Sequence, residues 1–251
     1  PTVGLLSRTH IVPISLSQDT AGPMTSSVQD AWLMASVMAG ADKNADDHLL
    51  EIPSSSLLAT DLKGKRIGVV RYRQGDNPHV LAVYEKALKQ LEASGATLVD
   101  ISDFSQPDSF WADSYNVLLS EFHHSINEYL SNSPASLPAK NLSELIEFNQ
   151  ATPRELALFD QDIFEKSLAS SAIDSDEYKH ALRLIRDTAG ENGIDALLSK
   201  HNVDVLVAPS NSPSFLIDGV YGDHSPVGFI GIGYLAAIAG YPHLTVPAGQ
   251  V

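Results

Sequence analysis

The chain contains no cysteine, so disulfides, thiolate nucleophiles and cysteine-ligated zinc or iron–sulfur sites are excluded among its 251 residues. Positive charge is scarce: 16 lysines and arginines stand against 31 aspartates and glutamates, a net charge of −15. Such a surface repels phosphate groups, so we expect no nucleic-acid partner and no membrane partner. No basic region followed by an apolar stretch opens the chain, which leaves cytoplasmic and periplasmic or secreted locations equally open.

One uncharged stretch, residues 225–251, is long enough to raise the question of a membrane span. A span needs about 20 consecutive apolar residues. Glycines and prolines such as Pro226, Gly233 and Pro242 interrupt this stretch throughout. We therefore predict a segment buried inside a soluble fold, and the 43% hydrophobic content supports a sizeable core.

A β–α–β pattern stands out in the first half of the chain. Residues 66–72 and 96–101 are short runs rich in β-branched residues, which predicts two strands. Between them, Asn77 is a candidate helix cap, Pro78 occupies the first helical position, and Gly95 ends the helix. A right-handed crossover to a parallel neighbour is the default for such a unit.

An amphipathic helix is predicted over residues 23–40. Its apolar residues recur at helical spacing, and Ser26 with Gln29 fits a capping box. Gly40 fits a left-handed C-terminal cap, and an acidic, polar loop follows over residues 42–61.

Residues 108–200 predict mainly helix, with breaks near 131–138 and Pro153. A third strand follows over residues 203–208, apolar enough to be buried on both faces. The loop 209–213 then lies at the carboxyl end of that strand, the edge where open α/β sheets bind ligands. These elements predict an α/β fold with a mixed, mostly parallel central sheet and helices on both faces.

The sequence contains no self-contained catalytic group that we can identify. No Gly-x-Ser-x-Gly elbow occurs, and Ser225 beside Asp223 and His224 is interpreted as a polar turn. Glu121-x-His123-His124 lacks the His-x-x-x-His spacing of a helical zinc pair, so a partly exposed helix face is preferred and no metal is expected. The residues alone leave two classes open, a part of an enzyme or a binding module.

Five blocks of the sequence, taken together and in order, resemble the amidase signature family. They are Pro1-Thr-Val-Gly-Leu-Leu-Ser-Arg8, Ser17-Gln-Asp-Thr-Ala-Gly-Pro23, Leu62-Lys-Gly-Lys-Arg-Ile-Gly-Val69 with Leu91-Glu-Ala-Ser-Gly-Ala96, Val205-Leu-Val-Ala-Pro-Ser-Asn-Ser-Pro213, and Ala239-Gly-Tyr-Pro-His-Leu-Thr-Val-Pro-Ala-Gly249. With Gly222-Asp-His224, the final part is most similar to the peptide-amidase-like branch. The blocks run from residue 1 to residue 251.

The resemblance implies a C–N hydrolase, an amidase that acts on linear amides by acyl transfer to a serine. The family's lysine, bridging serine and nucleophilic serine are expected upstream of Pro1, so no catalytic residue is assigned in this chain, and the chain alone is expected to be inactive. No cofactor is implied. The partners implied are a small-molecule or peptide amide substrate and the remaining segments of the same protein. The alternative is a non-catalytic α/β module that binds a small molecule or a protein.

The same resemblance suggests which residues of this chain serve the active site. Asp19 and Thr20 are expected to organise the loop around the nucleophile, and the equal alternative for Asp19 is that it only satisfies a tight turn. Asn211, Asp223 and Tyr234 lie in loops or junctions near the carboxyl edge of the sheet, which makes them candidates for the substrate pocket. Residues 1–251 are expected to form a single α/β amidase-like domain that is incomplete at both ends. Within it, residues 102–200 are expected to be a mainly helical insertion or pocket wall.

Overall fold

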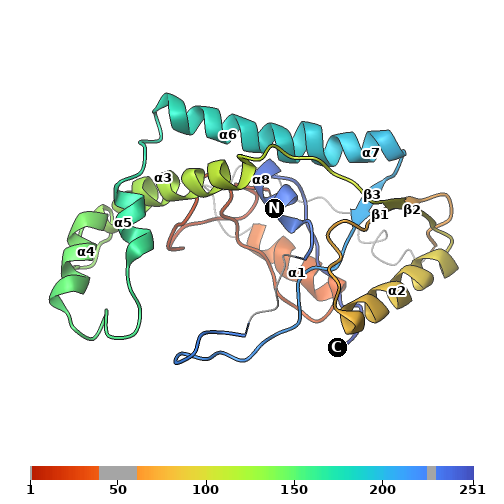
Figure 1. Cartoon of the computed structure of the whole chain (residues 1–251), viewed down its shortest axis with the longest axis horizontal. Coiled ribbons are helices and arrows are strands. Elements are labelled where there is room, and N and C mark those ends of the chain that lie inside the picture. The colour runs from red at the N-terminus through yellow and green to blue at the C-terminus, as the bar shows by residue number, and fades with distance from the viewer. Residues whose placement is uncertain (1, 40–60, 225–229) are drawn as a thin grey trace. The chain divides into compact units, whose positions relative to one another are not determined.

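The computed structural model describes residues 2–39, 61–224 and 230–251, and its contacts divide the chain into two compact units (Figure 1). Unit 1 comprises Pro1–Ser7, Thr20–Ser105 and Thr188–Val251, and unit 2 comprises Arg8–Asp19 and Gln106–Asp187.

Unit 1 contains a parallel sheet. Its strands are β1 (Arg66–Val70), β2 (Thr97–Ile101) and β3 (Val205–Val207), arranged in the order β2-β1-β3. In the register, Gly68 of the central strand lies opposite Val99 on one side and Leu206 on the other. Strands that are parallel and joined through helices confirm the predicted α/β class.

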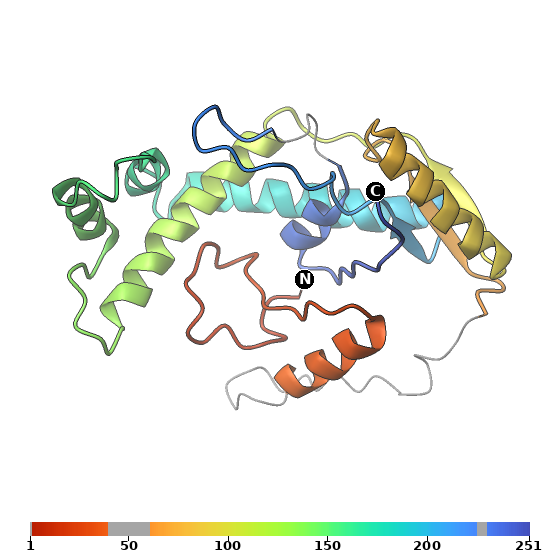
Figure 2. The ribbon, with the colours of Figure 1, turned by 90° about the horizontal axis from the view of Figure 1, so that it is seen from below.

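The predicted β–α–β unit is confirmed in detail. Helix α2 (Pro78–Ala93) runs beside the strands (Figures 1 and 2). The Asn77 side chain accepts the His79 and Val80 backbone N–H groups at 3.0 and 3.2 Å, as expected for an N-cap. The Gly95 backbone, at φ +98°, adopts a left-handed conformation that favours glycine and ends the helix.

The core of unit 1 is apolar and mostly local in sequence. Val69, Tyr84 and Leu88 are buried together, and three partly buried residues pack against them: Leu91, Leu98 and Val207. The prediction that the third strand is buried on both faces was wrong. Val205 is 48% exposed, because in the described part of the chain β3 pairs only with β1 and its outer side faces an open groove.

Among the described residues, three further helices and a π-helical segment belong wholly to unit 1. They are α1 (Val28–Ala39), η2 (Gly190–Asp195), α7 (Ala196–His201) and α8 (Gly233–Ala239). The first begins later than residue 23, because Ser27 rather than Ser26 caps it: the Ser27 Oγ accepts the Asp30 N–H at 3.1 Å and donates to the Asp30 carboxylate. The predicted cap at Gly40 and nearly all of the predicted loop 42–61 lie outside the described residues.

Unit 2 is helical, as predicted for this region. It contains α3 (Phe110–Ser131), α4 (Leu142–Ala151) and α5 (Asp162–Leu168), followed by most of α6 (Asp176–Ala189). Ile126, Leu142 and Ile146 form its apolar core. The helices are interrupted near both predicted positions, and the last part of the predicted helical region consists of α6, η2 and α7 in succession.

Candidate functional site

Asp19 closes a tight turn in unit 2. Its Oδ2 accepts the backbone N–H groups of Ile14 and Ser15 at 2.7 and 2.8 Å, and its own N–H donates to the Ser15 carbonyl at 3.1 Å. One carboxylate oxygen therefore satisfies two consecutive donors and holds the backbone in one shape. The neighbouring Thr20 makes only a local contact, from its hydroxyl to the Ala21 carbonyl at 3.1 Å.

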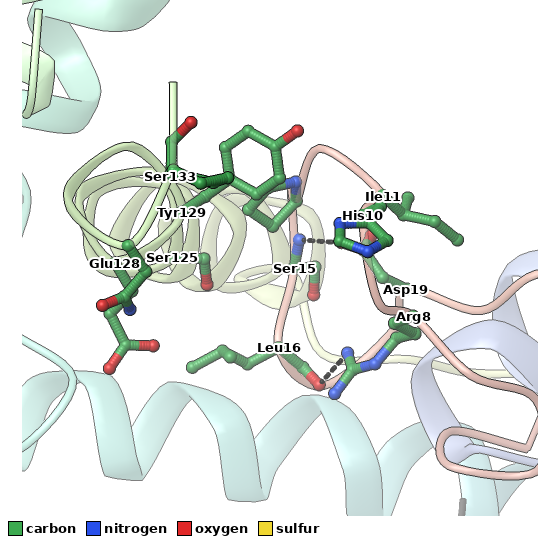
Figure 3. Close-up of a pocket in the computed structure, with 13 residues that line it drawn as sticks. Arg8, His10, Ile11, Ser15, Leu16, Asp19, Ser125, Glu128, Tyr129 and Ser133 are labelled. Atoms are coloured by element: carbon green, nitrogen blue, oxygen red, sulfur yellow. Dashed lines mark hydrogen bonds between the residues drawn. The ribbon is translucent and has the colours of Figure 1, made fainter. Parts of the chain in front are cut away.

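A cavity of about 490 Å³ lies beside this turn (Figure 3). Its lining combines residues of the 8–19 segment with the C-terminal half of α3, and Ser15 and Asp19 belong to it. The Arg8 guanidinium donates to the Leu16 carbonyl at 3.1 Å, which ties two parts of the 8–19 segment together (Figure 3). Ser125, on α3, is buried, and its hydroxyl has no partner within the described ranges.

Glu121 is buried beneath the same turn, so the expectation of a partly exposed helix face was wrong for this residue. It is 0% exposed and accepts hydrogen bonds from hydroxyls of Ser15, Ser17 and Tyr178. The reason is that Glu121 falls on the inward stripe of α3, four residues after the buried Val117. His124 lies nearer the surface, with its Nε2 3.6 Å from the Glu128 carboxylate.

Unit 1 has a larger groove of about 770 Å³ with a mainly apolar lining. One wall is α2, another is β3 with the loop that follows it, and a third is the chain after α8. Asn211 lies in this lining, and its side-chain oxygen accepts the Ser212 N–H at 2.9 Å. The Ser210 hydroxyl donates to the Thr245 hydroxyl at 3.2 Å, which joins two segments of the lining.

His243 is a further polar residue in this lining. Its ring packs so closely against Gly233 that a Cβ added there would lie 3.3 Å from the ring. Desolvation by these neighbouring atoms lowers the pKa of His243, because it disfavours the charged imidazolium.

The other two candidate pocket residues lie elsewhere in unit 1. Tyr234 is in the first turn of α8, where the Arg73 guanidinium lies 5.6 Å from the centre of its ring. Asp223 is exposed and accepts the Asp218 N–H at 2.8 Å, within a turn where Asp218 in turn accepts two N–H groups. Of the three candidates, only Asn211 lies in the groove lining; Ser225 is outside the described residues.

The described residues contain no group of three or more side chains suited to hold a metal ion. Within the same ranges, none of the helices has the length and apolar character needed to cross a membrane.

Sequence reasoning missed two polar clusters. Glu121 with its serine and tyrosine partners could have been suspected, since an acid on an otherwise inward-facing stripe of α3 needs donors. The bond from the Tyr241 hydroxyl to Asp195, at 2.6 Å, had no comparable signal, because it depends on a π-helical turn over Gly190–Asp195.

The chain is similar to known proteins along its whole length. A family model described as Amidase matches residues 1–251. A probable amidase of Arabidopsis thaliana is 28% identical over 99% of this chain and 46% of its own length. One subunit of the glutamyl-tRNA(Gln) amidotransferase of Acinetobacter baylyi is 30% identical over 99% of this chain and 51% of its own length.

Among solved structures, native peptide amidase from Stenotrophomonas maltophilia is 35% identical, with a TM-score of 0.84. The match covers 100% of this chain and 51% of that enzyme. The chain thus spans about half the length of the relatives it matches.

Proposed function

Because the chain belongs to the amidase family across residues 1–251, we propose that the protein carrying it hydrolyses C–N bonds of linear amides. The observation that carries this proposal is the 35% identity and 0.84 TM-score to a peptide amidase over the whole chain. On this proposal, residues 1–251 form part of one α/β amidase domain, and the helical region 102–200 is a wall of its substrate pocket.

The proposed chemistry is acyl transfer through a serine. The serine attacks the amide carbonyl, backbone N–H groups stabilise the oxyanion, and a bridging serine relays the proton to a neutral lysine. The amine then leaves, and water releases the acyl group as a carboxylate. The resemblance assigns all three side chains to positions upstream of Pro1, so we propose that residues 1–251 alone do not turn over amides.

Residues of this chain would support that chemistry without taking part in it, by organising the active site or lining the substrate pocket. We assign Asp19 and Thr20 to organising the loop near the nucleophile, and the two N–H bonds to Asp19 support this for Asp19. Asn211, Asp223 and Tyr234 remain candidates for the substrate pocket. The position of Asn211 in the unit 1 groove supports its assignment.

A C-terminal peptide amide is the substrate class that we place first, ahead of aryl and alkyl amides. The support is the structural likeness to an enzyme that is named for peptides. The amidotransferase subunit of Acinetobacter baylyi is 30% identical, so its reaction is a weaker second possibility. If no hydrolysis occurs, the alternative function is that of a non-catalytic module that binds a small molecule or a protein.

The test uses the complete gene product and three substrates: an N-acylated peptide amide, an anilide and a simple alkyl amide. We expect release of ammonia from the peptide amide at rates well above those of the other two, while the matching free peptide acid releases none. Residues 1–251 expressed alone should give background rates. No release above background from the complete product contradicts the proposal. Turnover by residues 1–251 that survives repurification and is lost in His224→Ala contradicts the assignment of the catalytic residues.

A further inference from the structure

Glu121 joins three segments of unit 2 through one buried carboxylate. Its Oε2 accepts the Ser15 hydroxyl, the Ser17 hydroxyl at 3.0 Å and the Ser17 backbone N–H at 3.1 Å. Its Oε1 accepts the Tyr178 hydroxyl of α6 at 2.6 Å. Both serines are buried as well, at 1% and 8% exposure, so water does not compete for these donors.

The donors to Glu121 are all neutral. In the part of the chain that the structure describes, no lysine or arginine forms an ion pair with it. Burying a carboxylate costs free energy unless hydrogen bonds replace its hydration. The four donors are therefore needed to offset the cost of burying Glu121. Burial raises the pKa of Tyr178, and its bond to Glu121 adds to that rise, so the phenol keeps its proton and remains a donor.

The donors also depend on Glu121, as Glu121 depends on them. Removing the acceptor would leave the buried hydroxyls of Ser15 and Ser17, the Ser17 N–H and the partly buried Tyr178 hydroxyl without this partner, and an unsatisfied buried donor is costly. Ser15 and Ser17 lie more than 100 residues from Glu121 in sequence, so no local propensity replaces these bonds. Asp19 thus closes the turn through hydrogen bonds inside it, and Glu121 binds the same turn to helix α3.

This turn matters because it forms a wall of the unit 2 cavity. Ser15, Leu16 and Asp19 line the cavity (Figure 3). The Ser15 hydroxyl is also one of the donors to Glu121. Movement of the turn would therefore change the cavity and the position of Asp19 together.

We propose that Glu121 is a positioning residue: it fixes the Ile14–Asp19 turn, and through that turn it supports catalysis without touching the substrate. The catalytic half of this inference rests on the proposed function, whereas the structural half does not. Two carboxylates thus fix the turn in different ways. Asp19 orders its backbone through hydrogen bonds inside the turn, and Glu121 anchors it to α3 and α6.

The test is peptide-resolved hydrogen exchange on the complete gene product, read at the segment 12–20. Glu121→Leu keeps a similar volume and removes both acceptor oxygens, and we expect exchange in this segment to be about tenfold faster or more. Glu121→Gln keeps one oxygen for the serines and can donate its amide to the Tyr178 oxygen, so we expect a smaller increase. Tyr178→Phe removes a single donor and should change exchange least. Glu147→Gln, an exposed acid on α4 of the same unit, is the matched control and should leave the segment unchanged.

Kinetics separate positioning from stability alone. In the Glu121→Leu variant we expect kcat to fall about tenfold or more with KM within about twofold, and Glu121→Gln should recover most of the loss. Unchanged exchange over 12–20 in folded Glu121→Leu overturns the proposal. If that variant does not fold, the same readout in Glu121→Gln and Tyr178→Phe decides, and no local increase in either overturns it. If the unaltered protein shows no amidase activity, the proposed function fails while the exchange result still decides the anchoring role.

Discussion

Unit 1 and unit 2 bury their chains by different means. In unit 1, the core is formed by apolar residues of β1, β2, β3 and α2, and most of them are near neighbours in sequence. In unit 2, an apolar core around Leu142 lies beside a polar cluster in which a single carboxylate holds a turn more than 100 residues away. The comparison teaches that the apolar core of unit 1 can largely be predicted from local sequence patterns. The polar cluster of unit 2 depends instead on a few specific partners that are distant in sequence.

The largest expected effects come from the two apolar cores. Leu88→Ala in unit 1 and Leu142→Ala in unit 2 each remove a side chain that is at most 2% exposed. We expect each to lower the free energy of unfolding by about 2–5 kcal/mol, because lost burial adds to the cavity left behind. Urea unfolding of the complete gene product measures this. A loss below about 1 kcal/mol in one of them would show that the unit concerned does not depend on its core in this way.

Gly231→Ala should be the next most damaging change, and it acts on unit 1 alone. Gly231 has φ +94°, and a Cβ there would lie 2.8 Å from the Pro209 carbonyl oxygen. We expect a loss of about 1–3 kcal/mol, since backbone strain and a clash with main-chain atoms add together. The control is Gly219→Ala, where nothing lies within 4 Å of the added Cβ and no left-handed φ is required. Equal melting temperatures for the two variants would contradict the prediction.

A smaller effect is expected from the helix caps, which differ between the units. Asn77 caps α2 with two hydrogen bonds, whereas Ser109, at the start of α3, makes no side-chain cap bond. Asn77→Ala should therefore cost about 1 kcal/mol and Ser109→Ala almost nothing. Asn77→Asp, which retains the acceptor, should restore stability. Equal losses at the two caps, measured by urea unfolding, would break the comparison.

The smallest expected effect concerns pH and His243. Because burial lowers the pKa of His243 in the folded state, the unfolded state binds its proton more readily. Stability should thus be unaffected by this residue above its unfolded pKa of about 6.5 and should decline as the pH falls below it. His243→Gln should flatten the acid side of the curve of melting temperature against pH. An identical acid limb in both proteins contradicts the direction of the shift.

The sequence was enough to predict the elements whose causes are local. Asn77, Pro78 and Gly95 specify where α2 begins and ends, and runs rich in β-branched residues indicate β1 and β2. The strand at Val205 was misjudged because apolar composition cannot tell a strand with two neighbours from one that borders a groove. Similarly, two adjacent serines both fit a cap, and only the structure selects Ser27 over Ser26.

The candidate site was less predictable, because its key contacts are distant in sequence. The Asp19 turn could be anticipated, since its donors lie four and five residues away. The bond from Ser17 to Glu121 spans 104 residues, and nothing in the spacing of either residue indicates the other. Tyr234 was selected for its place near the sheet edge, yet its nearest described charge partner is Arg73 rather than a residue of the groove.

The measurement that tests the account most directly is the steady-state kinetics of Asp19→Ala in the complete gene product, acting on a peptide amide. Asp19 accepts two backbone N–H groups in the turn that we assign to organising the loop near the nucleophile. Losing hydrogen bonds to a charged group costs about 1.5–3 kcal/mol, which corresponds to a fall of roughly 10- to 100-fold. We predict that this fall appears in kcat, with little change in KM. An unchanged kcat together with a lower melting temperature would show that Asp19 only stabilises the turn, and the link between unit 2 and catalysis would be wrong.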